Sequence, residues 1–336
     1  MAEKNVLLSY GSGGRLTHQL IDEYIVPNFS NNILNKLEDS GVFNVKGTRF
    51  SFTTDSYVVD PIFFPGGDIG KLAVCGTVND LSMSGAVPLY LSCGFIIEEG
   101  FSIKDFELVL NSMRKAAKEA GIDIITGDTK VVHKGKGDKI FVNTSGIGIV
   151  QKGINVDSKN IKNRDKILIN GTIGDHGTSV LARRENIQFK NEILSDVAPL
   201  NKMVKELIDS GIEIHTMKDP TRGGIATSLK EIAEKSNKGI EIFENKIPVR
   251  EEVKGLCEIL GFDPIYIANE GKLILFTPEK DSEKALNIMK KSKYGKNSEI
   301  IGSVINDHAG KVILRTTIGG SRIVDMLSGE QLPRIC

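Results

Sequence analysis

A helix that is apolar on almost every side constrains the fold of this chain more than any other feature. The stretch from Ile69 to about Ser84 has helical spacing, and Asp68 before it suits the N-cap position. Such a helix has to be covered on all sides by other elements. Asn79 and Asp80 interrupt the apolar pattern, and buried polar groups need partners. We expect either hydrogen bonds to neighbouring loops or contact with a cation or substrate.

The length and the composition predict a two-domain protein. At 336 residues the chain exceeds the size at which one hydrophobic core stops growing. We expect an N-terminal domain over 1–155, a C-terminal domain over 156–325 and a flexible tail over 326–336. The 43 basic and 43 acidic residues cancel, which argues against nucleic acid or an anionic membrane as a partner. The absence of a signal-peptide pattern and of a long apolar run predicts a cytoplasmic location.

Three aspartates on separate elements predict a magnesium–nucleotide site. A strand from Thr48 to Thr54 leads to Asp55, and a strand over 123–126 leads to Asp128. Ligand groups commonly lie at the carboxyl ends of strands in open α/β sheets. Asp80 adds a third carboxylate, and hard oxygen ligands together with substrate phosphates suit Mg²⁺. Taken one at a time, each aspartate has an ordinary explanation as a cap or a turn residue.

A glycine-rich turn, Gly11–Gly14, precedes a helix-like stretch from Leu16 to Val26. Backbone N–H groups in such a turn can approach a phosphate without obstruction by side chains. By itself this pattern is more often a plain turn. Lys130, two residues after Asp128, adds a positive charge near the predicted phosphates.

The second half of the chain contains further candidate residues. Asp219 suits the N-cap of a helix, and Arg222 beyond it can meet a phosphate. A strand over 265–268 is expected to deliver Glu270 to a cleft, with a turn residue as the plainer explanation. Two strands within 300–315 are expected to pair as a hairpin.

Cys336 is the last residue of the sequence, in a segment where Gly329 and Pro333 interrupt regular structure. The four cysteines form no C-x-x-C pair, which argues against a disulfide framework or a zinc site. A thiol on a flexible tail can enter a pocket and leave it again. Its own carboxylate disfavours the thiolate, and Arg334 opposes that effect. The plain alternative is a frayed terminus that ends in cysteine.

Read in order, several short motifs resemble the HypE family of hydrogenase maturation proteins. The resemblance extends over nearly the whole chain and includes the ending at Cys336. The matching segments are Thr54–Pro61, Phe63–Asp80, Gly127–Val132, Asp219–Gly224, Asn269–Gly271 and Pro333–Cys336. The chain is also similar to a wider group that contains aminoimidazole ribonucleotide synthetase, selenophosphate synthetase and thiamine-monophosphate kinase. One departure is Tyr10, which stands where many members of the family carry a histidine.

The resemblance implies the two-domain fold of the PurM-like superfamily. Its N-terminal half is α+β and forms a homodimer through its strands. Its C-terminal half is α/β, and ATP lies in a cleft lined by both halves.

The resemblance also implies an ATP-dependent carbamoyl dehydratase. A HypF-like carbamoyltransferase places a carbamoyl group on Cys336, and ATP then phosphorylates the carbamoyl oxygen. Loss of phosphate leaves a thiocyanate. The cyanide passes to a HypC–HypD scaffold complex and becomes a ligand of the iron centre of a [NiFe]-hydrogenase.

Individual residues receive roles in this chemistry. Lys130 would neutralise the charge that develops during phosphoryl transfer. Glu270 is the candidate general base for the protons of the nitrogen, and Asp80 is the alternative. The predicted metal ligands are Asp55, Asp80 and Asp128. The predicted nucleotide-binding residues are Gly11, Gly13, Gly14, Asp55, Asn79, Asp128 and Thr129.

Two other functions stay open. A kinase or ligase of the same superfamily, acting on a free small molecule, would not need Cys336. A non-catalytic scaffold for hydrogenase maturation would bind ATP and its partners but would form no thiocyanate.

Overall fold

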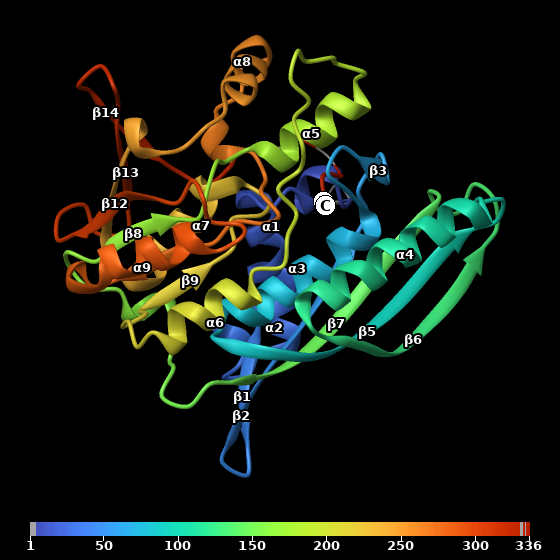
Figure 1. Ribbon diagram of the computed structural model, residues 1–336, viewed down its shortest axis with the longest axis horizontal. Helices are drawn as coiled ribbons and strands as arrows, with labels where there is room; N and C mark the ends of the chain where they lie inside the picture. The colour runs from blue at the N-terminus through green and yellow to red at the C-terminus, as the bar shows by residue number, and fades with distance from the viewer. Residues whose placement is uncertain (1–4, 330–331, 333) are drawn as a thin grey trace.

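The computed structural model describes residues 5–329, 332 and 334–336. Two sheets with helices packed against them form the two halves of the molecule (Figure 1). The first sheet has the order β1-β2-β7-β5-β6, in which β5 and β6 run parallel and the other neighbours antiparallel. Its strands are β1 (Gly41–Val45), β2 (Thr48–Tyr57), β5 (Ala86–Glu98), β6 (Asp123–Val132) and β7 (Ile140–Val150).

The apolar helix, α3 (Ile69–Met83), lies in the middle of the molecule, as the sequence predicts (Figure 1). Asp68 caps it, because its Oδ1 accepts from the N–H groups of Gly70 at 2.7 Å and Lys71 at 3.2 Å. The first sheet, α4 (Ile103–Ala120) and α6 (Asn201–Asp209) pack around it. Before α3, the short strands β3 (Phe63–Phe64) and β4 (Gly67–Asp68) pair with each other.

The second sheet belongs to the C-terminal half and has the order β14-β13-β10-β12-β8-β11-β9. The predicted hairpin within 300–315 is wrong, because β10 lies between β12 and β13 and pairs with both. The strands are β8 (Lys166–Ile169), β9 (Thr216–Lys218), β10 (Gly239–Phe243), β11 (Ile274–Thr277), β12 (Glu299–Ile305), β13 (Val312–Arg315) and β14 (Ser321–Val324).

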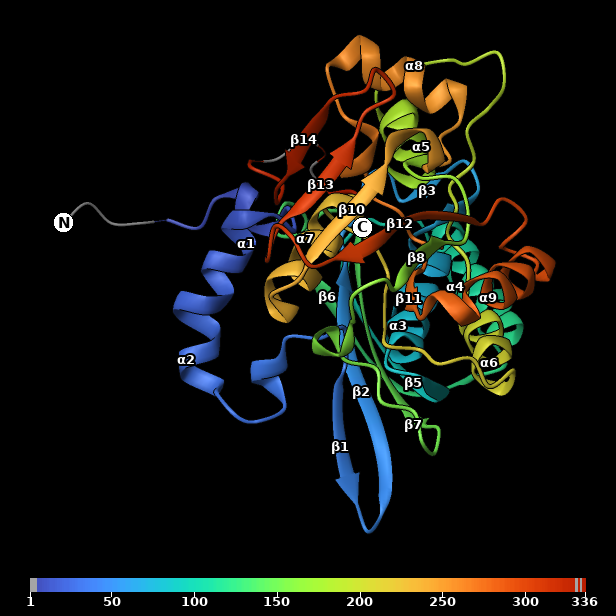
Figure 2. The ribbon, with the colours of Figure 1, turned by 90° about the vertical axis from the view of Figure 1, so that its left-hand side faces the viewer.

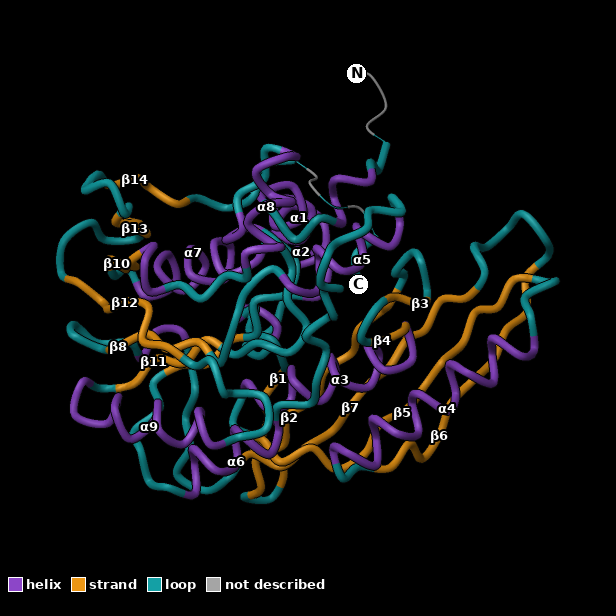
Figure 3. The backbone as a smooth tube through the Cα atoms, turned by 45° about the horizontal axis from the view of Figure 1, so that its top comes forward, coloured by secondary structure: helices purple, strands orange, loops and turns teal. Residues whose placement is uncertain are grey.

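Helices cover both faces of the second sheet. Alternate residues of its strands join two separate apolar cores, one beneath α7 and one beneath α6 and α9. A third core fills the space around α3 in the N-terminal half, where α3 and α4 follow one face of the first sheet (Figure 3). The helices of the second half not yet bounded are α5 (Asp175–Arg184), α7 (Gly224–Ser236), α8 (Glu251–Leu260) and α9 (Glu279–Lys291). Within the described residues, no helix is long and apolar enough to cross a membrane.

The first residues form a helical arm that packs on the C-terminal half (Figure 2). The arm comprises α1 (Arg15–Leu20), a π-helical turn (Ile21–Ile25) and α2 (Val26–Phe29), so it is longer than the expected helix. The His18 Nε2 lies 2.9 Å from the Glu231 carboxylate of α7. The arm therefore brings the glycine-rich turn at its start to the junction of the two halves.

Candidate functional site

Cys336 lies inside the molecule, because the last residues of the chain pair with the segment that follows β2. The Val58 N–H donates to the Cys336 carbonyl at 3.0 Å, and the Asp60 N–H donates to the Arg334 carbonyl at 3.1 Å. Ile335 is buried and Cys336 is half-buried. Figure 1 marks this end of the chain at the junction of the two halves. The tail therefore presents its thiol to the interior.

The thiol stands in an environment that keeps it protonated. Burial is the main cause that raises the pKa of Cys336 to about 12. Glu270 and Asp55 act in the same direction, and the positive charge of Arg222 acts against them. A pocket of about 150 Å³ adjoins the thiol, and its lining includes Gly11 and Arg222. The site combines a neutral thiol, two carboxyl groups and one guanidinium.

Glu270 is buried, and its predicted role as a general base stays a prediction. It is 4% exposed, and its Oε1 has no hydrogen-bond partner among the residues that the structure describes. Burial raises its pKa well above the ordinary value, Asp55 raises it further, and Arg222 opposes the shift. The Glu270 N–H donates to Asp196 at 3.0 Å, which fixes the backbone. A buried carboxyl group with a raised pKa is a candidate for proton transfer.

Asn79 is satisfied by hydrogen bonds to neighbouring loops, the first of the two explanations considered for a polar residue in α3. Its amide nitrogen donates to the carbonyls of Ala198 at 3.1 Å and Glu270 at 3.3 Å. Its amide oxygen accepts from the Leu200 N–H at 2.8 Å. These hydrogen bonds to neighbouring loops fix the backbone of Glu270 against the central helix. A contact of Asn79 with nucleotide stays a prediction.

Asp80 belongs to a crowded group of buried carboxyl groups. The Thr53 hydroxyl donates to Asp80 at 2.9 Å. Burial raises the pKa of Asp80 well above the ordinary value, and Asp219, Asp55 and Asp39 raise it further. Negative charges collected in this way favour protons or a cation as a partner.

The carboxyl group chemistry fits Mg²⁺ only in part. Among residues 5–329, 332 and 334–336, no three His, Cys, Asp or Glu side chains stand close enough to ligate a metal together. Mg²⁺ commonly uses one or two carboxylates and completes its shell with waters and substrate phosphates. Asp55 and Asp80 supply such oxygens. A magnesium site at this position therefore requires phosphate oxygens, and it stays a prediction.

Asp55 and Asp128 were expected at strand ends, but β2 and β6 continue past them. Within the sheet, the pairing register places the two aspartates on opposite faces. In β2, Asp55 lies opposite Thr144 of β7. In β6, Asp128 lies opposite Gly94, which in turn lies opposite Asn143 of β7. Neighbouring residues of a strand point to opposite faces. One chain therefore does not bring Asp128 to the site that contains Asp55.

Asp128 and Lys130 form an ion pair on the outer face of the edge strand. The Lys130 Nζ lies 2.6 Å from Asp128 Oδ2, and the two side chains are 67% and 71% exposed. The hydrogen bond from Lys130 lowers the pKa of Asp128. The expected roles of Asp128, Thr129 and Lys130 in an ATP site stay predictions.

The glycine-rich turn reaches the site through Arg222. The Arg222 Nη1 donates to the Gly11 carbonyl at 3.0 Å. Gly13 has a φ of +76°, and a Cβ there would stand 2.4 Å from the Arg222 Cβ. The Arg15 N–H after the turn donates to the Leu327 carbonyl of the tail at 3.0 Å. The turn therefore touches both the guanidinium and the base of the tail, and phosphate binding by it stays a prediction.

Two local predictions around the site are wrong. Helix α7 begins at Gly224 with Gly223 as its N-cap, so Asp219 is not a cap but a buried member of the carboxyl group cluster. The expected strand over 265–268 is instead a 3-10 turn, Pro264–Tyr266, followed by a loop. Glu270 consequently reaches the site from a loop before β11.

Sequence reasoning missed two residues that hold the tail. The His176 Nε2 lies 2.7 Å from the Ile335 carbonyl, and Arg184 Nη2 donates to the Arg334 carbonyl at 2.9 Å. Both side chains come from α5. No signal in the sequence pairs α5 with a segment 150 residues further on. Pro333, which was expected to interrupt regular structure in the tail, lies outside the described residues.

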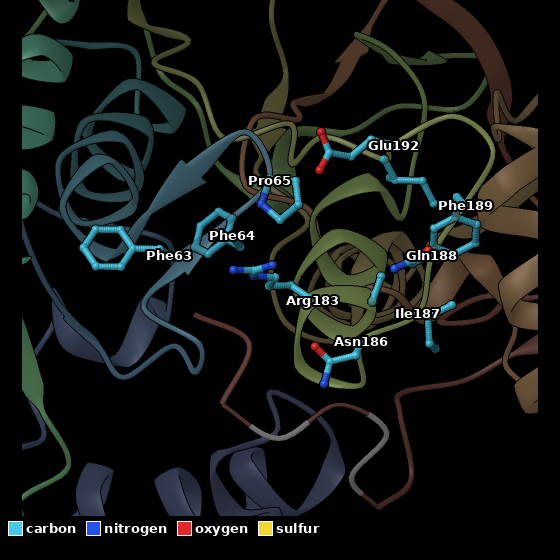
Figure 4. Close-up of a pocket in the computed structure, with 11 residues that line it drawn as sticks. Phe63, Phe64, Pro65, Arg183, Asn186, Ile187, Gln188, Phe189 and Glu192 are labelled. Atoms are coloured by element: carbon cyan, nitrogen blue, oxygen red, sulfur yellow. The ribbon is translucent and has the colours of Figure 1, made fainter.

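A second pocket lies at the end of α5. It has a volume of about 520 Å³ and opens between Phe63–Pro65 and the segment over 182–193 (Figure 4). Arg183 and Glu192 contribute charged groups to its lining. The residues predicted for the site are not part of this lining, so we assign no part of the reaction to this pocket.

The fold and the site define a two-domain protein of the AIR synthase related group. Residues 37–150 match the N-terminal domain of the AIR synthase related proteins, and residues 164–315 match their C-terminal domain. A solved structure titled AaThiL complexed with AMPPCP and TMP shares the fold at 17% identity and a TM-score of 0.72.

Closer relatives narrow this assignment. The carbamoyl dehydratase HypE of Bradyrhizobium diazoefficiens is 48% identical over 98% of this chain and 95% of its own length. That of Escherichia coli is 41% identical over 99% of both chains. A crystal structure of a HypE–HypF complex has 51% identity and a TM-score of 0.87, covering 92% of this chain and 99% of the other. A HypE structure in complex with ATP has 48% identity and a TM-score of 0.84, covering 99% and 100%. The chain belongs to the HypE family of carbamoyl dehydratases and is an enzyme.

Proposed function

We propose that this enzyme dehydrates an S-carbamoyl group on its own Cys336 to a thiocyanate at the expense of ATP. The observation that carries the proposal is the position of Cys336, whose thiol lies inside the molecule beside Glu270 and Arg222. A tail thiol with no function would gain nothing from burial among charged groups. The ATP complex of a 48% identical HypE supports ATP as the second substrate.

The first chemical step activates the carbamoyl oxygen. That oxygen attacks the γ-phosphorus of ATP, ADP leaves, and the amide nitrogen loses one proton, which gives an S-bound imidate phosphate. The transfer depends on positioning and on charge stabilisation. Arg222 is the cation beside the thiol and would stabilise the transferred phosphoryl group. Magnesium on Asp55 and Asp80 would supply further neutralisation of phosphate charge.

The second step forms the nitrile. A base takes the remaining proton of the nitrogen, the C–O bond breaks with its electron pair on phosphate, and the C≡N bond forms. Glu270 suits this base because its Oε1 has no hydrogen-bond partner among the described residues and because burial raises its pKa, which makes the carboxylate a stronger base. Asp80, hydrogen-bonded to Thr53, remains the alternative base.

Mass analysis tests the whole proposal. The protein is incubated with ATP, Mg²⁺, carbamoyl phosphate and a HypF-like carbamoyltransferase, and the peptide that contains Cys336 is analysed. We expect a peptide that first gains one carbamoyl group and then loses one water. If Cys336 stays unmodified while ATP is bound or hydrolysed, the tail is not the substrate, and a small-molecule kinase or a scaffold becomes the better explanation.

Partners follow from the same proposal. The crystal structure of a 51% identical HypE with HypF supports a HypF-like carbamoyltransferase as the donor of the carbamoyl group. The cyanide would pass to a HypC–HypD scaffold complex for a [NiFe]-hydrogenase, and the protein would work in the cytoplasm. The tail would leave the interior for both transfers.

A homodimer through the first sheet would also complete the site. Phe52, Ile147 and Tyr90 stand side by side across β2, β7 and β5 on the face that α3 does not cover. Phe52 is 49% and Tyr90 45% exposed. Asp128 shares this outer face. A second chain packed on this apolar row would bury it and bring Asp128 and Lys130 into the interface.

We expect Tyr90→Asp to give a monomer of unchanged secondary structure, because it places a charge in the centre of the apolar row. Leu108→Asp, at an exposed position of α4, is the control and should stay dimeric. Light scattering after size-exclusion chromatography measures the mass.

Lys130→Ala should keep the dimer and lose turnover. A Tyr90→Asp monomer with full activity would show that one chain contains the complete site and that Lys130 has no role in it.

A further inference from the structure

The docked tail is held by two kinds of contact, and only one of them depends on side chains. The main-chain pairing of Arg334 and Cys336 with Val58 and Asp60 would form with almost any sequence. Selection of this tail therefore requires additional groups that recognise its side chains or fix its carbonyls. Such groups come from the β6–β7 loop and from α5.

The Arg334 side chain is recognised at two points. Its Nε donates to the Val58 carbonyl at 2.9 Å, and its Nη1 is paired with Asp138 in the β6–β7 loop. Arg334 has a φ of +50°, a conformation that residues other than glycine rarely adopt without compensating contacts. The same loop holds the strand partner of the tail, because Lys139 Nζ lies 3.0 Å from Asp60.

Helix α5 fixes the carbonyl groups of the tail. Arg184 donates through Nε to the Asp60 carbonyl at 2.8 Å and through Nη2 to the Arg334 carbonyl at 2.9 Å, so one guanidinium bridges both strands of the pair. Arg184 therefore anchors the residue that Asp138 recognises.

His176 holds the residue next to the thiol. Its Nε2 faces the Ile335 carbonyl at 2.7 Å, and since a carbonyl only accepts, the proton resides on Nε2. Its Nδ1 lies 2.8 Å from the Ser195 hydroxyl, which donates to it in the neutral tautomer. Burial lowers the pKa of His176, which favours this neutral form. The edge of Phe64 packs against the imidazole at 5.3 Å between ring centroids.

From these contacts we propose that Asp138 and His176 are positioning residues for the reaction at Cys336: Asp138 selects the tail through Arg334, and His176 sets the depth of the thiol through the Ile335 carbonyl. The effect of these two residues on the reaction at Cys336 rests on the proposed function. Their effect on docking of the tail does not, because docking can be measured without turnover. It makes Arg334 a recognised part of the substrate. It also makes the β6–β7 loop a determinant of how long the tail stays inside.

The rate of thiol alkylation measures the docking directly. The full-length protein without nucleotide is treated with iodoacetamide, and labelling of each cysteine is followed by peptide mass analysis. Cys75, Cys93 and Cys257 are buried and serve as internal reporters of unfolding. Labelling of Cys336 alone reports release of the tail.

A charge exchange tests the role of Asp138. Asp138→Lys and Arg334→Glu should each raise the labelling rate of Cys336 about two- to fivefold, the range expected from loss of one partly exposed ion pair. The double variant should return toward the wild-type rate. Asp307→Lys, at an exposed position in the β12–β13 loop, is the control and should leave the rate unchanged. Wild-type labelling in Asp138→Lys, or no recovery in the double variant, would overturn the role of Asp138.

A donor exchange tests the role of His176. His176→Gln can keep a donor N–H toward the Ile335 carbonyl, whereas His176→Leu removes it. We expect faster labelling of Cys336 in the leucine variant and a rate near wild type in the glutamine variant, with the three buried cysteines unlabelled in both. Equal rates in the two variants would overturn the role of His176. If the wild-type protein forms no thiocyanate, the proposed function is wrong. The labelling results would still stand, because they do not depend on turnover.

Discussion

Cys336→Ser should abolish formation of the carbamoyl and thiocyanate products while leaving ATP binding intact. The variant changes one atom, and the backbone contacts of the tail with Val58 and Asp60 do not involve the side chain. The nucleotide should therefore bind with an unchanged dissociation constant in calorimetry. Product formation is measured from the mass of the tail peptide with the carbamoyltransferase present.

Cys257→Ala is the matched control for this experiment. Cys257 is a buried thiol of α8 and belongs to a separate apolar cluster. Its replacement should lower stability slightly and retain turnover. Turnover by the Cys336→Ser protein, or loss of its nucleotide affinity, would contradict the proposed reaction.

Glu270→Gln should lower the rate of product formation by about 10²- to 10⁴-fold, the contribution typical of a general base. Glutamine keeps the shape of the side chain but cannot accept the proton. The base works when deprotonated, and burial raises the Glu270 pKa, so wild-type turnover should fall as the pH falls through this raised pKa. The remaining turnover of the Glu270→Gln variant should not show this fall at low pH. Glu279→Gln, at a surface carboxylate of α9, should behave as wild type.

The same substitution should increase stability at neutral pH. A folded-state pKa above the unfolded value means that the stability contributed by Glu270 is present below the unfolded pKa and is lost as the pH rises through the folded pKa. Glutamine removes this penalty, so the free energy of unfolding should rise at neutral pH. Thermal unfolding at several pH values measures the difference, which should vanish in acid. A variant that is inactive and also less stable at neutral pH would indicate a structural role for Glu270.

Local features of the fold could be predicted from the sequence because they depend on neighbouring residues. Asp68 caps α3 as expected, and α3 covers Ile69–Met83, close to the expected stretch from Ile69 to about Ser84. The pairing of β10 with both β12 and β13 could not be predicted, since it depends on contacts between residues 60 to 72 positions apart. Asp219 was assigned to a cap for the same reason, because only the tertiary structure shows the carboxyl groups around it.

The sequence suggests candidate residues for the site, but it does not show how they are arranged. Asp55 contributes to the raised pKa of Asp80, of Glu270 and of Cys336, so these candidates surround one aspartate. Asp128 fails to join them within one chain because β6 continues through it, and the pairing register decides which face a strand residue takes. His176 and Arg184 act on main-chain carbonyls of a distant segment, a contact that composition and periodicity do not encode.

The tail that pairs with Val58–Asp60 has a consequence for the kinetics. A reacting group carried on the same chain is present at an effective concentration set by the length of the tether, in the millimolar range for short flexible segments. Turnover should then have no Michaelis constant for the carbamoyl group, and dilution of the loaded protein should leave the rate per chain unchanged. Each chain has to be reloaded after one reaction. The supply of carbamoyl groups and the removal of cyanide, and not the affinity for a free substrate, should therefore set the steady-state flux.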